Sequence, residues 1–491
     1  MKTFSKKYLV LAIYAVIILV STANAQDNLK KGITAVKSGD YVTGINLLKD
    51  VVSKDKGYDA NFYYGEALLR TGSIEDARKY LEIAIKDDEE GVDALKSLGE
   101  YYTMKKEYDK ANTYFKKALK VDPNNIPALI AQSANFQAQG KIDDANNVLY
   151  LAQSISKQQF EKEDPKIYVA LGDNWYSRDS YKAALDNYDK ALKLNSNIAK
   201  AYYGKGRAYF KLKNVSDAYT AFDDAIKKDA NFAEAYLEKG KLLYFNGNYK
   251  AAAEAFKKFS QLKPGSQEGN SYFAKTLYAE GKYDEALSLL QEVLKIDPAS
   301  YTGNLYTAYI YSEKEAPDSL TQVDYYNKAV EYFKKVPMKD FEAEDLIKYG
   351  KVLVNVRDFE SSYGIFKSAI SKDSLDSKAY YEAGKAHFKG EDYDNTLALL
   401  NKASALGMKD RGLSLFQGFT CFYLKKYDES AVYFQDAISI DDKFTLSYLW
   451  LAKCYRVLNK NEEAIKVYEQ VIIIEPDNQE AKDILKLLKK Q

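Results

Sequence analysis

The sequence predicts an all-α solenoid, a stack of helical hairpins, on three observations. A repeat of 34 residues is plainest in 199–300, where Gly206, Gly240 and Ala274 stand 34 positions apart. Apolar and small residues within each repeat recur at steps of three and four, which is the period of a helix. All eight prolines avoid the predicted helix interiors, which proline disfavours. Self-similarity at this period is typical of repeat architectures.

Each repeat is expected to contain two helices and a turn. In the segment 233–264 the first helix is AEAYLEKGKLLYFN, the turn is Gly247 and Asn248, and the second helix is YKAAAEAFKKFSQLK. Thirteen such repeats fit between residues 27 and 478. Because no hairpin can bury its apolar side alone, neighbouring hairpins are expected to stack into one continuous body.

A small residue stands at the eighth position of every repeat, in the first helix. A large side chain there would push the two helices of the hairpin apart. These residues are Gly32, Gly65, Gly99, Ser133, Gly172, Gly206, Gly240, Ala274, Ala308, Gly350, Gly384, Gly418 and Ala452. A second series of small residues, such as Ala218 and Ala252, is expected to have the same role in the second helices.

The 34-residue repeat resembles the tetratricopeptide repeat (TPR), which has small, aromatic and proline residues at set positions. Residues 92–125 match six of these positions with Gly99, Tyr102, Ala111, Phe115, Ala118 and Pro123. The resemblance implies a right-handed α-solenoid of about 13 TPR hairpins that binds other proteins along its concave groove. With the N-terminal segment described below, the chain is similar to an exported bacterial TPR protein.

Two stretches interrupt the repeat, near 154–164 and near 313–324. After the second, the second helix of the hairpin is expected to resume at Tyr325. Insertions in repeat proteins gather on one face of the solenoid, so these stretches could be loops that contact a partner. We favour the alternative that they are surface loops without a role, which the fold tolerates. The same repeat continues on both sides of each stretch, so we expect one solenoid over 26–478.

Residues 479–491 are expected to form an amphipathic helix. Ala481, Ile484, Leu485 and Leu488 form one apolar stripe, and lysines occupy the other side. The end of a solenoid needs a cover for its last apolar face, so we interpret this segment as a C-terminal capping helix. A helix that lies on a membrane surface is the alternative.

Residues 1–25 have the features of a secretory signal peptide. Lysines at the start precede an apolar run of 13 residues from Tyr8 to Val20, and Ala23 and Ala25 precede the expected cleavage site. Because this run is short for a bilayer span, we favour a cleaved signal peptide, and an uncleaved N-terminal membrane anchor is the alternative interpretation. We expect an exported protein in the periplasm of a Gram-negative bacterium, with no integral membrane span in the mature chain.

Charge and cysteine content bear on the class of partner and on the compartment. When the three lysines of the leader are taken from the 71 basic residues, 68 remain against 70 acidic ones, so we expect no nucleic-acid partner. Cys421 and Cys454 are the only cysteines and are expected to be buried small hydrophobes, with a disulfide as the alternative. So few cysteines suit a periplasm better than a eukaryotic secretory route.

No catalytic, metal-binding or cofactor-binding constellation emerges from the sequence. His387 is the one histidine, and it stands at a core position of its repeat. No Cys/His cluster has ligand spacing, and no glycine-rich phosphate loop follows a strand. We therefore predict a protein that is not an enzyme and uses no cofactor or metal. Active residues in the insertions are the alternative, but Asp164, Glu313 and Asp324 have no matching base or nucleophile.

The TPR resemblance implies that the first helices line the groove, through the second, fifth, ninth and twelfth positions of each repeat. In this chain those positions combine lysine or arginine with aromatic rings one helical turn apart. Such a ladder could grip an extended chain, with rings on its apolar side chains and cations on its acidic ones. The candidate partner-binding residues are Tyr176, Tyr203, Arg207, Phe210, Lys241, Tyr244, Lys275, Tyr278, Lys385 and Phe388.

Other interpretations of this ladder stay open. The carboxylate-clamp type of TPR has asparagine at the ninth position, whereas these repeats have lysine or arginine, so no clamp for a terminal carboxylate is expected. Lysine stems also shield rings from water, which would explain the pattern without a ligand. A non-enzymatic scaffold that binds proteins of the bacterial envelope is the leading hypothesis. The alternative is a periplasmic protein that binds glycans or cell-wall fragments, since rings also stack on sugars.

Overall fold

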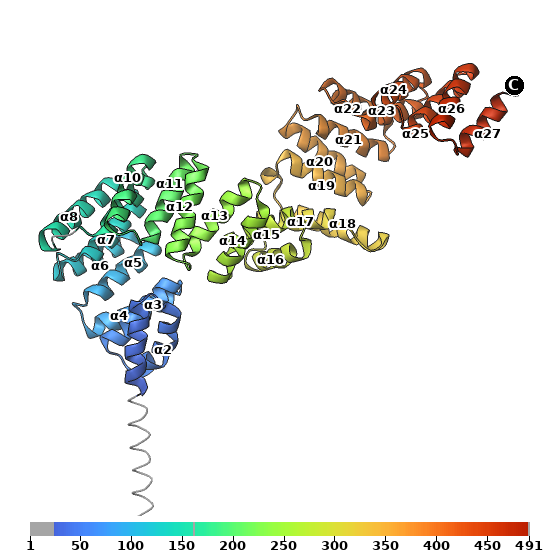
Figure 1. Cartoon of the computed structure of the whole chain (residues 1–491). Coiled ribbons are helices and arrows are strands. Elements are labelled where there is room, and N and C mark those ends of the chain that lie inside the picture. The colour runs from blue at the N-terminus through green and yellow to red at the C-terminus, as the bar shows by residue number, and fades with distance from the viewer. Residues whose placement is uncertain (1–23, 161–162, 490–491) are drawn as a thin grey trace, which may run out of the picture. The chain divides into compact units, whose positions relative to one another are not determined.

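Every described segment of regular structure is helical. A computed structural model describes residues 24–160 and 163–489. Within these ranges no strand is present (Figure 1), so the all-α prediction is confirmed. The predicted signal peptide up to residue 23, and the last two residues of the predicted capping segment, lie outside the described residues.

The described helices fall into two compact units, with the boundary inside α13 (Ala233–Phe245). The N-terminal unit ends at Leu242 and the C-terminal unit begins at Leu243. A helix that ends at Lys37 opens the N-terminal unit. It is followed by α2 (Tyr41–Lys54), α3 (Tyr58–Thr71), α4 (Ile74–Asp87), α5 (Val92–Met104), α6 (Tyr108–Val121), α7 (Ile126–Ala138), α8 (Ile142–Phe160), α9 (Pro165–Ser177), α10 (Tyr181–Leu194), α11 (Ala199–Lys211) and α12 (Val215–Lys228).

The C-terminal unit continues the same alternation of helices and short turns. Its helices are α14 (Tyr249–Leu262), α15 (Gln267–Ala279), α16 (Tyr283–Ile296), α17 (Tyr301–Glu313), α18 (Ser319–Lys334), the 3-10 helix η1 (Met338–Asp340), α19 (Ala343–Asn355), α20 (Phe359–Lys372), α21 (Ser377–Lys389), α22 (Tyr393–Ala405), α23 (Arg411–Tyr423), α24 (Tyr427–Ile440), α25 (Thr445–Val457), α26 (Asn461–Ile474) and α27 (Gln479–Leu488).

Consecutive helices pair into hairpins. In the N-terminal unit α3 packs on α4 and α5 on α6, and in the C-terminal unit α15 packs on α16 and α25 on α26. Within each unit, second helices also contact the first helix of the following hairpin, as α10 contacts α11 and α16 contacts α17. Counted over the described residues, thirteen hairpins precede the single helix α27, in agreement with the predicted solenoid of about 13 hairpins.

Each hairpin contains one large, fully buried side chain from its second helix. In the α11–α12 hairpin this is Phe222, which lies against Gly206, where an added Cβ would stand 2.5 Å from the ring. Burying such a side chain stabilises the fold by about 2–3 kcal/mol. The small eighth residue is therefore needed to make room for this side chain. The equivalent residues, each at most 2 % exposed, are Leu48, Leu81, Phe115, Leu149, Tyr188, Phe222, Phe256, Leu290, Phe333, Phe366, Leu400, Phe434 and Tyr468.

In the described hairpins other than α17–α18, the turn between the two helices has one residue in the left-handed region. In the α11–α12 turn this residue is Lys213, with φ of 61°, and in the following hairpin it is Gly247, with φ of 74°. The next amide closes the helix end, as the N–H of Asn214 donates to the carbonyl of Tyr209 at 2.9 Å. This is the hydrogen bond of a Schellman motif, which satisfies a carbonyl that the helix leaves open.

The two predicted interruptions of the repeat are built differently. At the first, α8 is 19 residues long, whereas most second helices have 14. At the second, α17 ends at Glu313 and α18 begins at Ser319, six residues before the predicted Tyr325. The earlier start has a local cause, because the Asp318 side chain accepts from the amide of Thr321 at 2.9 Å and caps the helix.

The last helix and the two cysteines lie in the C-terminal unit. Ala481 and Leu485 of α27 are buried against Tyr468 and other apolar residues of α25 and α26. Cys421 and Cys454 are free thiols with no exposed surface, so the structure has no disulfide between them. In the described part of the chain, no helix is long and apolar enough to cross a bilayer.

Candidate functional site

The ten predicted site residues all lie on first helices of hairpins. Nine of them are half-buried, and Phe210 exposes 43 % of its surface. In the N-terminal unit, Tyr176 lies on α9, Tyr203, Arg207 and Phe210 lie on α11, and Lys241 lies on the part of α13 that precedes the unit boundary. In the C-terminal unit, Tyr244 lies on the rest of α13, Lys275 and Tyr278 lie on α15, and Lys385 and Phe388 lie on α21.

In the N-terminal unit, Arg207 lies between two rings. Its guanidinium carbon is 4.0 Å from the ring centroid of Tyr176 on the preceding hairpin and 5.7 Å from that of Tyr203 on its own helix. Burial raises the pKa of Tyr203 to about 12, so this ring carries a neutral hydroxyl at physiological pH. A guanidinium stacked on a ring face keeps its N–H edges available for a planar acceptor.

Lys241, also in the N-terminal unit, has a different environment. Its ammonium lies 2.9 Å from a carboxylate oxygen of Glu238, three residues earlier on α13, and its side chain is only 17 % exposed. The positive charge of Lys241 is therefore offset within the protein. Arg207 and Lys241 occupy the same repeat position, but their environments differ: Arg207 lies between aromatic rings, and Lys241 is paired with a carboxylate.

In the C-terminal unit, Lys275 lies among tyrosines. Its ammonium nitrogen is 5.3 Å from the ring centroids of both Tyr272 and Tyr306. Burial lowers the pKa of Lys275 below its usual value, and no other group contributes to the shift. The predicted residue Tyr244 extends the same cluster, because its ring centroid is 6.3 Å from that of Tyr272.

Tyr278 is joined to a carboxylate that sequence analysis left without a role. Its hydroxyl donates to both oxygens of Glu313, at 2.8 and 2.9 Å. Lys348 of α19 reaches the same carboxylate at 3.2 Å and lies 4.1 Å from the ring centroid of Tyr309. Burial and the hydrogen bond to Glu313 raise the pKa of Tyr278. Glu313 thus links α15, α17 and α19 at the start of the second interruption.

A buried carboxylate, Asp345, lies beside this cluster. It accepts hydrogen bonds from the hydroxyls of Tyr309 and Tyr301, the latter at 3.2 Å, and from the amide of Glu342 at 2.9 Å. Sequence analysis missed both Asp345 and Lys348. Residues of one repeat contact residues of the next that stand about one period later in the sequence. Tyr309 and Asp345 are 36 residues apart, so the period could have indicated from the sequence that these two side chains meet.

Lys385 lines a small hollow in the C-terminal unit. The hollow has a volume of about 210 Å³ and is bordered by Lys351, Lys389 and Glu382. Glu382 pairs with Lys385 at 3.1 Å and approaches Lys351 at 3.8 Å. Lys385 is therefore partly neutralised, as Lys241 is. Phe388, one turn later on α21, packs edge-on against the ring of Phe416 at 5.3 Å.

His387 has a structural environment. Its ring stacks on that of Tyr363 with centroids 3.8 Å apart, and its Nδ1 lies 2.7 Å from a carboxylate oxygen of Asp392. Asp392 also caps α22 by accepting from the amide of Asn395. One face of the imidazole is thus engaged in packing, and its Nδ1 edge is engaged in the hairpin turn.

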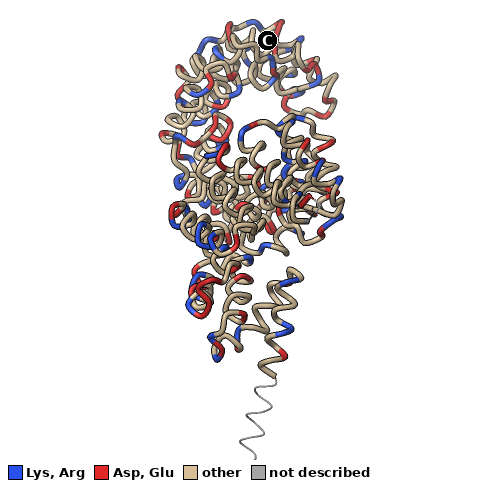
Figure 2. Tube along the Cα trace, turned by 90° about the vertical axis from the view of Figure 1, so that its left-hand side faces the viewer, with Lys and Arg blue, Asp and Glu red and all other residues tan. Residues whose placement is uncertain are grey.

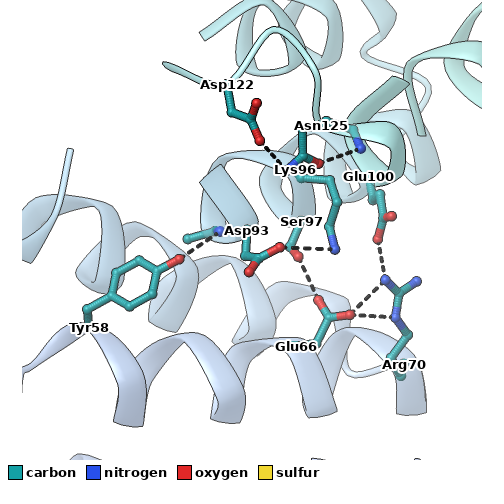
Figure 3. Close-up of polar contacts among 11 residues, drawn as sticks. Tyr58, Glu66, Arg70, Asp93, Lys96, Ser97, Glu100, Asp122 and Asn125 are labelled. Carbon is teal, nitrogen blue, oxygen red and sulfur yellow. Dashed lines mark hydrogen bonds and ion pairs between the residues drawn. The ribbon is translucent and has the colours of Figure 1, made fainter. Parts of the chain in front are cut away.

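A polar network on the first helices of the N-terminal unit was not predicted (Figure 3). Arg70 of α3 bonds to Glu66 on its own helix at 2.7 Å and to Glu100 of α5 at 2.6 Å, and Ser97 donates to Glu66 at 2.6 Å. Burial raises the pKa of Glu100, whereas Arg70 and Lys96 outweigh burial and lower the pKa of Glu66. One arginine thus joins two carboxylates of neighbouring hairpins.

This network reveals a change of sign at the ninth repeat position. Glu66 and Glu100 occupy that position in the second and third repeats, where later repeats have Arg207 or Lys275. Along the trace as a whole, acidic and basic residues are mixed (Figure 2). Among the described residues, no group of three histidine, cysteine, aspartate or glutamate side chains could hold a metal ion. The arrangement offers rings and cations rather than reactive groups.

Three family models described as tetratricopeptide or TPR repeats match the chain. One matches residues 243–309 and 422–488, a second matches 29–82, 67–126 and 214–267, and a third matches 172–213. Together these segments cover more than half of the chain and lie in both compact units.

One curated relative matches a short part of the chain. An uncharacterized protein ycf37 of Cyanophora paradoxa is 31% identical over 71 residues, which are 14% of this chain and 41% of that protein. The chain therefore spans less than half the length of this curated relative. Two solved structures are also similar.

The first is pilF of Pseudomonas aeruginosa, 20% identical with a TM-score of 0.37, over 45% of this chain and 98% of that one. The second is the C-terminal part of a TPR repeat-containing protein of Cytophaga hutchinsonii, 17% identical with a TM-score of 0.39, over 52% of this chain and 98% of that one. With TM-scores this low, the family models remain the basis of the assignment.

Proposed function

The chain belongs to the tetratricopeptide repeat family, whose members generally mediate contacts between proteins, and we propose from this membership that it is a non-enzymatic binding scaffold. Its partners are polypeptides held by the first helices. It uses no cofactor or metal in this role.

The observation that carries the proposal is the ladder of cations and rings on those helices. Arg207 stacks on Tyr176 in the N-terminal unit, and Lys275 lies between Tyr272 and Tyr306 in the C-terminal unit. Rings at an interface supply large contact areas at low conformational cost, and aromatic residues and arginine dominate binding energy where they are buried by a partner. A polypeptide offers the apolar and charged side chains that such a surface fits.

The cell envelope of a Gram-negative bacterium is the proposed location, and envelope proteins are the proposed partners. The basis is the N-terminal sequence, with its lysines, its apolar run and the small residues before Gln26. Cell fractionation and N-terminal sequencing test this. We expect a periplasmic protein that begins at Gln26, and a cytoplasmic protein that retains residues 1–25 would contradict it.

Site-specific photocrosslinking in intact cells tests the scaffold function. A photoreactive phenylalanine analogue in place of Phe210 puts the probe on a first helix, at a side chain that is 43 % exposed. We expect it to attach to a discrete protein, which mass spectrometry identifies. The identified protein is then purified, and its binding to the wild-type protein is measured directly.

The same analogue in place of Tyr219 is the matched control. Tyr219 is an aromatic residue on α12, the second helix of the same hairpin, and is 39 % exposed. We expect no crosslink, or a much weaker one, from this position. Equal attachment from both positions, or none from Phe210, would remove the first helices from the proposed function.

A further inference from the structure

The cations at the ninth repeat position fall into two groups. Lys241 and Lys385 are paired with glutamates three residues earlier, Glu238 and Glu382, at 2.9 and 3.1 Å. Lys351 approaches Glu382 as well. In the described part of the chain, the other three cations form no ion pair and have aromatic neighbours instead. These ring-flanked cations are Arg207, Lys275 and Lys453.

Each ring-flanked cation has one ring on its own helix and one on a neighbouring hairpin of the same compact unit. Arg207 lies near Tyr203 on its own helix α11 and Tyr176 on α9, and Lys275 lies near Tyr272 on its own helix α15 and Tyr306 on α17. The ammonium of Lys453 lies 4.3 Å from the ring centroid of Trp450, on its own helix α25, and 5.2 Å from that of Phe422 on α23. The arrangement therefore recurs three times, once in the N-terminal unit and twice in the C-terminal unit.

Ring faces do not satisfy these cations completely. A guanidinium has five N–H donors and an ammonium has three, whereas a ring face attracts the charge without accepting those hydrogen bonds fully. Arg207 and Lys275 are half-buried, so they have also lost part of their hydration. A carboxylate from outside would supply both acceptors and the opposite charge, and such hydrogen bonds are among the strongest in proteins.

We propose that Arg207, Lys275 and Lys453 are three separate subsites for aspartate or glutamate side chains of a partner polypeptide, with the flanking rings taking its adjacent apolar residues. This inference rests on the proposed scaffold function and states which chemistry the partner presents. Lys241 is not such a subsite, because Glu238 already offsets its charge.

Lysine stems also cover rings in proteins that bind nothing there, and a methionine substitution distinguishes that structural role from binding. Lys275→Met keeps an unbranched stem over Tyr272 and Tyr306 but removes the charge. A covering role predicts unchanged properties, whereas an anion subsite predicts weaker binding. Arg207→Met and Lys453→Met extend the test to the other two positions.

The probe is a fluorescently labelled peptide of alternating glutamate and leucine, with a glutamine and leucine peptide as its neutral counterpart. Fluorescence anisotropy with the purified protein measures both dissociation constants at low salt. We expect the acidic peptide to bind about tenfold more tightly or better, and its binding to weaken as salt rises. Each methionine variant should weaken binding about three- to tenfold, while Lys275→Arg and Arg207→Lys should retain most of it.

Lys205→Met and Lys348→Met are the matched controls, one in each unit; Lys205 lies 5.8 Å from the ring centroid of Tyr209 and is paired with Asp189 at 2.7 Å. Lys348 also lies on a ring, that of Tyr309, but is paired with Glu313. We expect both controls to bind the acidic peptide within about twofold of the wild type, with circular dichroism confirming that all variants remain helical.

Three outcomes overturn the inference: no binding of either peptide, equal binding of both, or an equal loss in the control variants. The scaffold function is judged separately, by the photocrosslinked partner. If that partner binds the Arg207→Met, Lys275→Met and Lys453→Met variants as tightly as the wild type, the carboxylate subsites are wrong and the scaffold function stands.

Discussion

At the residue scale, single contacts inside each hairpin decide which substitutions the fold tolerates. Glycine residues of this chain differ sharply in what surrounds them. A Cβ on Gly206 would stand 2.5 and 2.6 Å from two ring carbons of Phe222, which is itself 1 % exposed and has no room to move. A Cβ on Gly364, an exposed residue in the middle of α20, would meet nothing within 4 Å.

The same substitution should therefore have opposite effects at the two glycines. Gly206→Ala should destabilise its hairpin by about 1–3 kcal/mol, because it overpacks the contact with Phe222. Gly364→Ala should stabilise α20 by about 0.5–1 kcal/mol, since alanine has the higher helix propensity. Amide hydrogen exchange in the affected hairpin is the appropriate measurement, because repeat arrays open in parts. Effects of the same sign would refute the packing argument.

At the element scale, the hairpin turn is the recurring device. Among the described residues, seven turns place a non-glycine residue in the left-handed region: Lys106, Asp179, Lys213, Arg357, Glu391, Lys425 and Asn459. An L-residue with a side chain is strained there, whereas glycine is not. The left-handed conformation of these residues therefore raises the free energy of each turn, and the packing of the rest of the hairpin offsets this.

Lys213→Gly should stabilise the α11–α12 hairpin by about 0.5–1 kcal/mol by removing this strain. The converse change, Gly247→Ala in the following turn, should destabilise by about 1 kcal/mol, because φ there is 74°. Thermal unfolding followed by circular dichroism measures both. A lower midpoint for the Lys213→Gly variant would mean that the lysine side chain contributes more than its backbone strain costs.

The interruptions of the repeat show where element prediction from sequence stops. The repeat predicted the hairpins on both sides of 313–324, but it placed the start of the second helix at Tyr325 instead of Ser319. A repeat pattern cannot locate a helix inside an insertion, because the other repeats have no equivalent segment with which to compare it. The cap that starts α18, Asp318 with the amide of Thr321, is a local interaction outside that pattern.

At the scale of the whole molecule, buried tyrosines link stability to alkaline pH. The chain has 44 tyrosines. Burial raises the pKa of six of them to about 12, spread over both units: Tyr58, Tyr101, Tyr168, Tyr203, Tyr301 and Tyr381. In the unfolded chain a tyrosine titrates near 10, so the folded state keeps protons that the unfolded state loses between these values.

Stability should therefore fall as pH rises from about 10 to about 12, and this contribution should be fully present below pH 10. Thermal midpoints from circular dichroism across this range test the sign, with the ultraviolet absorbance of tyrosinate recorded in parallel. We expect these buried tyrosines to ionise together with the loss of helix. Complete ionisation of tyrosine in a fully helical protein would show that the phenols are accessible in the folded state.

The sequence by itself determined the helical hairpin, the number of hairpins and the helices that carry the candidate residues, because a period of 34 residues fixes which face each position occupies. Only the tertiary structure decided what those residues contact. Arg207 and Lys241 share one repeat position, yet Arg207 meets rings and Lys241 meets Glu238. Glu313, at the start of the second interruption, pairs with Lys348 of the following hairpin, although its repeat position gives it no such partner elsewhere in the described part of the chain. The reason is physical: hydrophobic periodicity records burial, which recurs in every repeat, whereas charge pairing depends on neighbours that differ from one repeat to the next.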